Sequence, residues 1–295
     1  MKRAVEQLVK SCSTCQLWKP SQKRYDKLPV KKHEQEPWTE IAVDPIGPYT
    51  YADEPDAPKF YSLMMMDMAT HWIEIAPLDD KTSVLTDKQL DKYWLCHYPR
   101  PLRVIHDEGP EFTGREFQEM LESYRIQSKP TSVENPQANG VLERVHQFVG
   151  NMIRTTRIDQ QAWIELLPAV AFAIRATHHT KLDASPAQLV FGRDMMSAVA
   201  FTANWARMLT RRERQTPREN IRENAARIDH SYNPGDKVLI VRKTCKLAKL
   251  AQPIDGIFPV TAVGTNGTVT VNRGRYTETI STRRIKPYFT TTTNV

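Results

Sequence analysis

The chain reads Trp-Thr-Glu-Ile-Ala-Val-Asp from Trp38 to Asp44, a run rich in apolar and β-branched residues that ends in an acid. A segment containing two prolines and a glycine follows it directly, at residues 45–48. This pattern predicts a β-strand that stops at a carboxylate. Similar apolar runs return at 60–68 and 72–78. The region therefore predicts an antiparallel meander in which Asp44 ends an inner strand.

A second run of the same kind covers residues 102–107 and ends in Asp107. Between the meander and this run, residues 83–98 have apolar positions at helical spacing. Pro99 and Pro101 then interrupt the helical pattern. The order predicts a strand, helix, strand crossover that delivers a second carboxylate to the end of a strand.

A third acid, Glu143, lies where a turn-rich segment at 135–141 gives way to a helical pattern. Because 34 of the 295 residues are acidic, the 35 residues between Asp107 and Glu143 are weak support by themselves. Context adds to the spacing. At about 100° per residue, Glu143 falls on a polar stripe beside an apolar one. The apolar stripe comprises Leu142, Val145, Val149, Met152 and Ile153.

These contexts resemble the integrases of gypsy-like long-terminal-repeat retrotransposons, which are related to retroviral integrases. The resemblance covers nearly the whole chain and is strongest at residues 38–193. It implies an α/β fold: a ribonuclease H-like core with a five-stranded mixed sheet flanked by helices, then a linker helix and a small C-terminal antiparallel β-barrel. The matching pieces are residues 43–48, 66–72, 106–112, 135–144 and 185–193.

The resemblance implies a Mg²⁺- or Mn²⁺-dependent DNA integrase that trims the 3′ ends of retrotransposon DNA and joins them to target DNA. In the family, three carboxylates hold two divalent ions, so Asp44 would bridge both ions, Asp107 would hold one and Glu143 the other. Two alternatives stay open. One is a cut-and-paste transposase with the same acids. The other is a catalytically decayed or host-adopted protein that only binds DNA or chromatin.

Several other titratable residues lie close to these acids in the sequence. Asp67, which follows an apolar run, is the strongest rival and could orient a neighbouring group of the site. Glu108 and Glu111 are expected to lie on the solvated surface or in a hydrogen-bonded turn. His106 and His146 are expected to be hydrogen-bonding partners of the acids, because a metal-activated hydroxide needs no imidazole base.

The composition favours a polyanionic partner. The chain carries 41 Lys and Arg against 34 Asp and Glu, and its pI is about 9.2. By resemblance the partner is double-stranded DNA, bound by a homo-multimer that could also contact chromatin and would act in the nucleus after a cytoplasmic stage. No apolar run reaches membrane-spanning length, so no membrane partner is expected. The candidate DNA contacts are Gln137, Arg144, Lys243, Lys246, Arg273, Arg283 and Arg284.

Cys12 and Cys15 form a Cys-x-x-Cys pair, which is half of a zinc site. The family has an amino-terminal His-His-Cys-Cys zinc domain, but no histidine precedes Cys12 here. We therefore expect weak or no zinc binding by this chain alone, and zinc only in a longer parent chain. The four cysteines are expected to be reduced thiols.

The composition and pattern of the sequence change after residue 192, which predicts further domains. Residues 204–230 are rich in arginine and predict a charged helix that Pro217 should break. Short β-like runs separated by Asn-Gly and Arg-Gly turns follow. The expected segments are a zinc-domain remnant with its linker (1–32), the catalytic core (33–200), a helical linker (201–232), a β-barrel that binds DNA or chromatin (233–290) and a disordered tail (291–295).

Overall fold

The structure, a computed structural model, describes residues 9, 11–19, 23–29, 36–49, 59–130, 145–151, 160–242, 252–265 and 267–290, with the backbone alone at 160–163 and 212. The chain forms two compact units. We name residues 32–131 and 136–214 the core unit, and residues 1–31, 132–135 and 215–295 the terminal unit. The five segments expected from the sequence stay a prediction.

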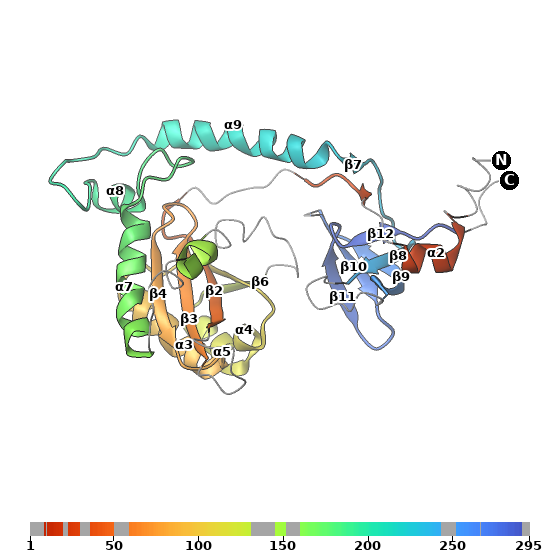
Figure 1. Cartoon of the computed structure of the whole chain (residues 1–295), viewed down its shortest axis with the longest axis horizontal. Coiled ribbons are helices and arrows are strands. Elements are labelled where there is room, and N and C mark those ends of the chain that lie inside the picture. The colour runs from red at the N-terminus through yellow and green to blue at the C-terminus, as the bar shows by residue number, and fades with distance from the viewer. Residues whose placement is uncertain are drawn as a thin grey trace. The chain divides into compact units, whose positions relative to one another are not determined.

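A five-stranded mixed sheet forms the centre of the core unit (Figure 1). The strand order β4-β3-β2-β5-β6 makes β2 the middle strand. β2 pairs antiparallel with β3 and parallel with β5, which confirms the predicted meander, the crossover and the mixed sheet. The strands are β2 (Glu40–Tyr49), β3 (Phe60–Asp67), β4 (Ile73–Leu78), β5 (Arg103–His106) and β6 (Gln127–Pro130).

Asp44 does not end its strand, so that detail of the prediction is wrong. β2 continues past Asp44 to Tyr49. Its pairing with β5 stops at Ala42, so the missing N–H of Pro45 leaves no gap in that ladder. A register shift against β3 and a positive φ of 118° at Gly47 accommodate the remaining turn-forming residues.

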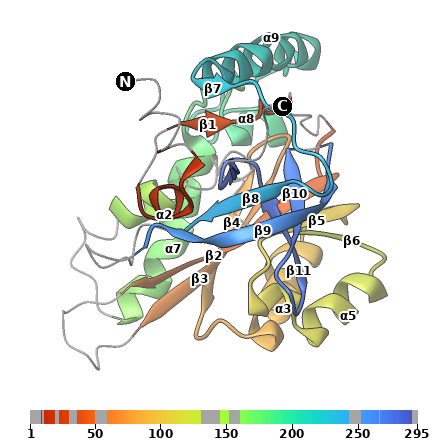
Figure 2. The same ribbon diagram turned by 90° about the vertical axis from the view of Figure 1, so that its right-hand side faces the viewer.

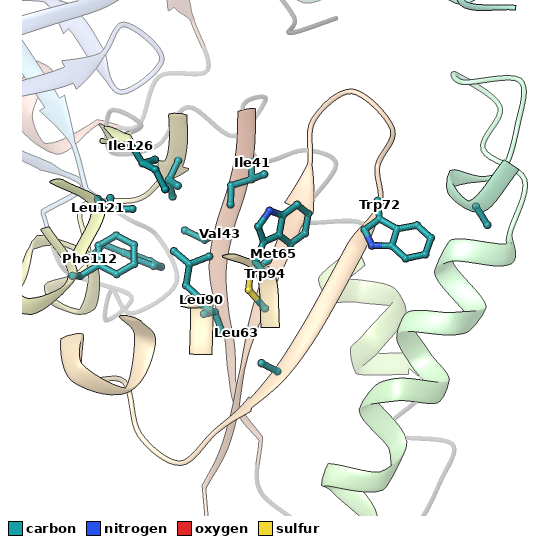
Figure 3. Close-up of a cluster of buried hydrophobic side chains, with 14 residues drawn as sticks. Ile41, Val43, Leu63, Met65, Trp72, Leu90, Trp94, Phe112, Leu121 and Ile126 are labelled. Atoms are coloured by element: carbon teal, nitrogen blue, oxygen red, sulfur yellow. The ribbon is translucent and has the colours of Figure 1, made fainter. Parts of the chain in front are cut away.

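Side chains of β2 alternate between the two faces of the sheet and separate two hydrophobic clusters. Ile41 and Val43 belong to the cluster in Figure 3, which also contains Trp94, Phe112 and Leu121 from the helices on that face. These side chains are all nearly inaccessible to solvent. The helical segments on this side are α3 (Ser83–Leu90), the π-helical segment η1 (Asp91–Leu95), α4 (Pro110–Thr113) and α5 (Arg115–Ser123).

The opposite face of the sheet is covered by a helix at residues 145–151 and by α7 (Gln160–Ala176). Ala42 of β2 packs there with Val149 and Val170, and all three are buried. The core unit also contains the short helix α8 (Pro186–Phe191), which begins with a capping box at Ser185. None of the helices among the described residues has both the length and the apolar character needed to cross a membrane.

Helix α9 (Trp205–Asn224) follows the core sheet in sequence and contains Pro217. The expectation that Pro217 breaks this helix is therefore wrong. Proline removes one backbone N–H, which leaves the carbonyl oxygen of Glu213 without its helical donor. Both residues are exposed, so water can satisfy that carbonyl, and the helix continues.

An antiparallel five-stranded sheet of order β11-β10-β9-β8-β12 forms the centre of the terminal unit (Figure 2). It confirms the predicted small antiparallel β-domain. Gly267 and Gly274 have positive φ values of 77° and 91°, as the predicted turns require. The strands are β8 (Lys237–Val241), β9 (Ile254–Val263), β10 (Thr268–Asn272), β11 (Thr277–Ser281) and β12 (Ile285–Pro287).

The amino-terminal segment belongs to the same unit as this sheet. Strand β1 (Arg24–Tyr25) pairs in parallel with β7 (Arg227–Ile228), and the two strands lie side by side in Figure 2. The side chain of Arg227 is buried and donates to the carbonyl oxygens of Tyr25, Asp26 and Thr282. Helix α2 (Ser13–Trp18) contacts β9. Residues far apart in sequence therefore form one folding unit.

Candidate active site

The pairing of β2 with β5 places the segments that carry Asp44 and Asp107 next to each other. Ala42 of β2 lies opposite Ile105 of β5. Asp44 and Asp107 each follow this pair by two residues, Asp44 within β2 and Asp107 just after the end of β5. Ala42 and Ile105 belong to the buried cluster under α7, and Asp44 shares the side-chain alternation of Ala42. The two acids therefore follow paired positions of neighbouring parallel strands.

The helix at 145–151 packs over Asp44. His146 Nε2 lies 3.5 Å from Asp44 Oδ2, and the Asp44 side chain is 18% exposed. Burial lowers the pKa of His146 below its ordinary value of 6.5, so the imidazole is mainly neutral near pH 7. The ring therefore touches Asp44 without placing a full positive charge beside it.

A chain of hydrogen bonds holds the backbone of Asp107. His106 Nδ1 donates to the Asp107 carbonyl oxygen at 2.5 Å, and His106 Nε2 accepts from Ser128 Oγ at 2.8 Å. Gln118 donates to the same hydroxyl oxygen at 3.2 Å. Burial lowers the pKa of His106, which agrees with this neutral tautomer and with a structural role. The exposed carboxylate of Asp107 accepts the Gly109 N–H at 3.0 Å.

Five of the candidate residues lie outside the described residues. They are Glu143, Gln137, Arg144, Lys243 and Lys246. The described part of the helix that carries His146 covers residues 145–151, which follow Glu143 closely in sequence. The assignment of Glu143 as the third carboxylate stays a prediction, and so do the DNA contacts of the other four.

Asp67, the strongest rival acid, is completely buried at the end of β3. Its carboxylate accepts the backbone N–H groups of Trp38 and Thr70 at 2.9 and 2.7 Å, and the Thr70 hydroxyl at 2.6 Å. Burial raises the pKa of Asp67 while these hydrogen bonds lower it. β2 and β3 are antiparallel and Asp67 pairs with Ile41, so Asp67 lies away from Asp44 along the strand. Asp67 holds the turn between β3 and β4.

The residues that the structure brings together suit a hard divalent cation. Asp44 and Asp107 offer carboxylate oxygens from a rigid sheet, and such oxygens are the ligands that Mg²⁺ prefers. Within the described ranges, no group of three or more His, Cys, Asp or Glu side chains is close enough to enclose a metal ion. A cation site formed by Asp44 and Asp107 therefore needs a further acidic ligand. The sequence predicts that Glu143 is this ligand.

Helix α9 carries five arginines on one face, which we name the arginine stripe. They fall within about 80° of the helix circumference, while the glutamates of the helix fall on the other side. Pairs four residues apart in the stripe have like charge, which destabilises an isolated helix by roughly 0.2–0.5 kcal/mol per pair. The stripe comprises Arg207 and Arg211, which reach Asp183 at 3.4 and 3.0 Å, and the exposed Arg214, Arg218 and Arg222, which have no ion-pair partner among the described residues.

Three predicted DNA-binding arginines lie in the terminal unit. Arg273 bonds to Asp255 and to Glu278, the latter at 2.7 Å. Arg283 bonds to Glu223 at 2.5 Å. The side chains of Arg273 and Arg283 are 14% and 15% exposed. Both guanidinium groups therefore form largely buried ion pairs with carboxylates of the same unit. Arg284 donates to the Val241 carbonyl oxygen at 3.3 Å. Their contact with DNA stays a prediction.

The two amino-terminal cysteines lie on α2, where Cys12 is the N-cap residue. Hydrogen bonds from the backbone and thiol of Cys15 lower the pKa of Cys12. Both are free thiols, and no third zinc ligand accompanies them among the described residues. The expected incomplete zinc site stays a prediction.

Glu111 is the residue near the site that sequence reasoning assigned wrongly. It was expected on the solvated surface or in a turn, yet it is 4% exposed and lies 3.6 Å from Lys81 Nζ. Twenty-nine residues of chain separate the two. No periodicity or spacing in the sequence predicts that Glu111 pairs with Lys81. Only the packing of α4 against the loop before α3 brings the two side chains together.

Comparisons with known proteins show what the chain is similar to. The family model described as integrase core domain matches residues 35–136. The Pro-Pol polyprotein of feline foamy virus is 26% identical over 238 residues, which cover 79% of this chain and 19% of the polyprotein. The gypsy retrotransposon integrase-like protein 1 of Bos taurus is 27% identical over 194 residues, which cover 64% of this chain and 37% of that protein. The chain spans less than a fifth of the first curated relatives that it matches.

A solved structure supports the fold over most of the chain. A protein of the simian T-cell lymphotropic virus intasome, solved in complex with the PP2A regulatory subunit B56 gamma, superposes with a TM-score of 0.59. The match has 14% sequence identity and covers 97% of this chain and 91% of that one. The chain is thus similar to an integrase core domain over residues 35–136, and to retroviral polyproteins and a gypsy retrotransposon integrase-like protein over most of its length.

Proposed function

We propose that this chain is a polynucleotidyl transferase that processes the 3′ ends of retroelement DNA and inserts them into target DNA. The observation that carries the proposal is that β2 pairs in parallel with β5 up to Ala42 and Ile105, two residues before Asp44 and Asp107, in a chain whose residues 35–136 match an integrase core domain model. The pairing of the two strands holds together the segments from which both carboxylates extend. The exposed Asp107 carboxylate leaves this edge open to a large substrate.

In this proposal Asp44, Asp107 and Glu143 hold two divalent cations, Mg²⁺ or Mn²⁺. When bound, the cations supply Lewis-acid stabilisation of the attacking and leaving oxygens of a phosphodiester. The protein contributes the fixed positions of the carboxylates. The His106 hydrogen bond and the Gly109 N–H hold the Asp107 segment from both sides.

Each of the two proposed reactions breaks one phosphodiester bond. In 3′ processing that bond is hydrolysed by water, and in strand transfer it is replaced by a new phosphodiester bond. In 3′ processing, a water oxygen attacks a phosphorus near the element's end, and the 3′ oxygen of the element leaves as a hydroxyl. In strand transfer, that 3′ hydroxyl attacks a phosphorus of the target strand, and the target's own 3′ oxygen takes the proton as it leaves. No nucleotide cofactor is needed, because strand transfer breaks one phosphodiester and makes one.

The proposed partner is double-stranded DNA, both the element ends and the target. The arginine stripe of α9 supports it, since a row of like charges that lowers helix stability is favourable beside a polyanion. We further propose that the chain acts as a homo-multimer in the nucleus, with chromatin as a possible additional partner. Cys12 and Cys15 would supply two thiolate ligands of a zinc site.

A disintegration assay on branched DNA tests the proposal, because that substrate requires only one transfer reaction. We expect joined product with Mg²⁺ or Mn²⁺, and a fall to background in Asp107→Asn and Glu143→Gln. Glu108→Gln is the matched control, because it removes an exposed carboxylate beside Asp107 and should leave the product unchanged. Full activity in Asp107→Asn would contradict the assignment. Salt-sensitive DNA binding without product in the unaltered chain would favour a DNA- or chromatin-binding protein instead.

A further inference from the structure

A buried carboxylate lies next to the exposed one in the candidate site. Glu111 occupies α4, four residues after Asp107, and is 4% exposed. Its neighbour Phe112 is completely buried between the sheet and the surrounding helices. The side chain of Glu111 is therefore held by packing and is not free to turn into solvent.

The charge of Glu111 is balanced by Lys81, in the loop between β4 and α3. Lys81 Nζ lies 3.6 Å from Glu111 Oε1 and 5.9 Å above the centre of the Tyr61 ring. Among the described residues, Lys81 is the cation within ion-pair distance of Glu111. A buried carboxylate without a partner is costly, and Lys81 is the partner of Glu111.

Gly109 allows Glu111 and Asp107 to approach each other. A Cβ atom at Gly109 would lie 2.7 Å from Glu111 Oε2 and 2.9 Å from Asp107 Oδ1. Both oxygens therefore contact the same small volume beside the Gly109 backbone. Any larger residue would push one of the carboxylates away. The charges of Glu111 and its partner Lys81 therefore act at short range on the Asp107 carboxylate.

We propose that Glu111 and Lys81 are positioning residues that keep the surroundings of Asp107 electrically neutral and so set the affinity of this edge for a divalent cation. The inference builds on the proposed function, in which Asp107 holds such a cation. Glu111 contributes a carboxylate next to the cation site, and Lys81 cancels its charge. The exposed Asp107 carboxylate then remains the group on this side that attracts the cation.

The proposal predicts opposite effects for the two single substitutions. Glu111→Gln leaves the Lys81 ammonium unbalanced near Asp107, which repels a divalent cation. Lys81→Met leaves a second negative charge near Asp107, which attracts one. The double variant is neutral again, as the unaltered pair is. A pair that served only folding would give changes of the same sign, because each single substitution would loosen the same contact.

Manganese titration of the purified full chain, followed by the electron paramagnetic resonance signal of free Mn²⁺, measures this directly without DNA or turnover. We expect the dissociation constant to rise about threefold or more in Glu111→Gln, to fall about threefold or more in Lys81→Met, and to return within about twofold in the double variant. Higher salt should shrink both shifts. The matched controls are Asp229→Asn and Lys27→Met, which break an exposed ion pair in the terminal unit and change the net charge in the same way.

The outcomes separate the two hypotheses. Loss of Mn²⁺ binding in Asp107→Asn, with unchanged binding in Glu111→Gln and in the double variant, would overturn the role of the pair and leave the proposed function intact. Equal Mn²⁺ binding in the unaltered chain and in Asp107→Asn would overturn the metal site itself. If Lys81→Met fails to fold, the comparison of Glu111→Gln with the double variant still decides, because the two differ only in whether residue 81 carries a positive charge.

Discussion

Substitution of Asp67 by alanine separates a structural acid from a catalytic one. The Asp67 carboxylate is completely buried and accepts three hydrogen bonds, from the Trp38 N–H, the Thr70 N–H and the Thr70 hydroxyl. Thr70 Oγ1 in turn accepts the Trp72 N–H at 3.1 Å. The substitution therefore removes the acceptor on which the β3–β4 turn depends.

The expected loss follows from these contacts. A buried donor left without its acceptor costs roughly 1–3 kcal/mol, and three donors lose their acceptor in Asp67→Ala. Removing the buried carboxylate offsets part of this loss of stability, since burial raises the pKa of Asp67 and so opposes its ionisation. We expect a net loss of about 3 kcal/mol in the free energy of unfolding of the core unit. Asp67→Asn keeps the volume and one acceptor oxygen, so about 1–2 kcal/mol is expected.

Urea unfolding followed by tryptophan fluorescence is the assay. Trp38, Trp72 and Trp94 lie in or against one hydrophobic cluster of the core unit, so their emission reports its unfolding. Asp79→Asn is the matched control, because Asp79 is exposed in the turn after β4 and should change stability by less than about 0.5 kcal/mol.

One result would refute the structural assignment. If Asp67→Asn were as stable as the unaltered protein and yet lost Mn²⁺ binding and strand transfer as fully as Asp107→Asn, Asp67 would be acting on the cation. We expect the reverse: reduced stability, with Mn²⁺ affinity retained wherever the protein is folded.

Three further predictions concern the terminal unit and α9. Arg227→Met should lower the melting temperature of the terminal unit in calorimetry, because three backbone carbonyl oxygens lose a charged donor; an unchanged transition would contradict the role of this side chain in joining β1 to the sheet. The hydrogen bond from Arg273 lowers the pKa of Asp255, so its contribution to stability is present above the ordinary value of 3.8 and is lost as the pH falls through the lowered value. In Asp255→Asn, acid unfolding of the terminal unit should lose this part of its pH dependence, and an unchanged profile would argue against it. Glutamine at the three exposed arginines of the arginine stripe should weaken DNA binding and reduce the slope of log affinity against log salt by about 0.9 for each lost phosphate contact, whereas an unaltered slope would show that this face does not meet DNA.

The main elements of the core unit could be predicted from the sequence. Alternating apolar residues indicated the strands, and the run from 83 to 98 indicated the crossover helix. The proline effects could not be predicted in the same way. Pro45 and Pro217 are breakers by local propensity, but Pro45 lies beyond the ladder with β5, and Pro217 lies on an exposed helix face. In both places the tertiary environment removes the penalty that local chemistry assigns to proline.

The candidate site could be predicted only in part. The contexts of Asp44 and Asp107 nominated both acids, and each follows the paired residues Ala42 and Ile105 by two positions. Glu111 was assigned to the surface or a turn, because its four-residue separation from Asp107 carries no information about burial. Its partner Lys81 comes from a different loop.

The sequence by itself determined which residues alternate, which stretches are helical and where acids follow apolar runs, because these are local properties with periods of 2 and 3.6 residues. The tertiary structure alone decided that Lys81 balances Glu111 beside Asp107, and that residues 24–25 pair with residues 227–228 in the unit that also contains the sheet at 237–287. Such contacts depend on the register and packing of segments separated by tens to hundreds of residues. A local pattern specifies the face that a side chain occupies, but not the distant group that the fold places opposite it.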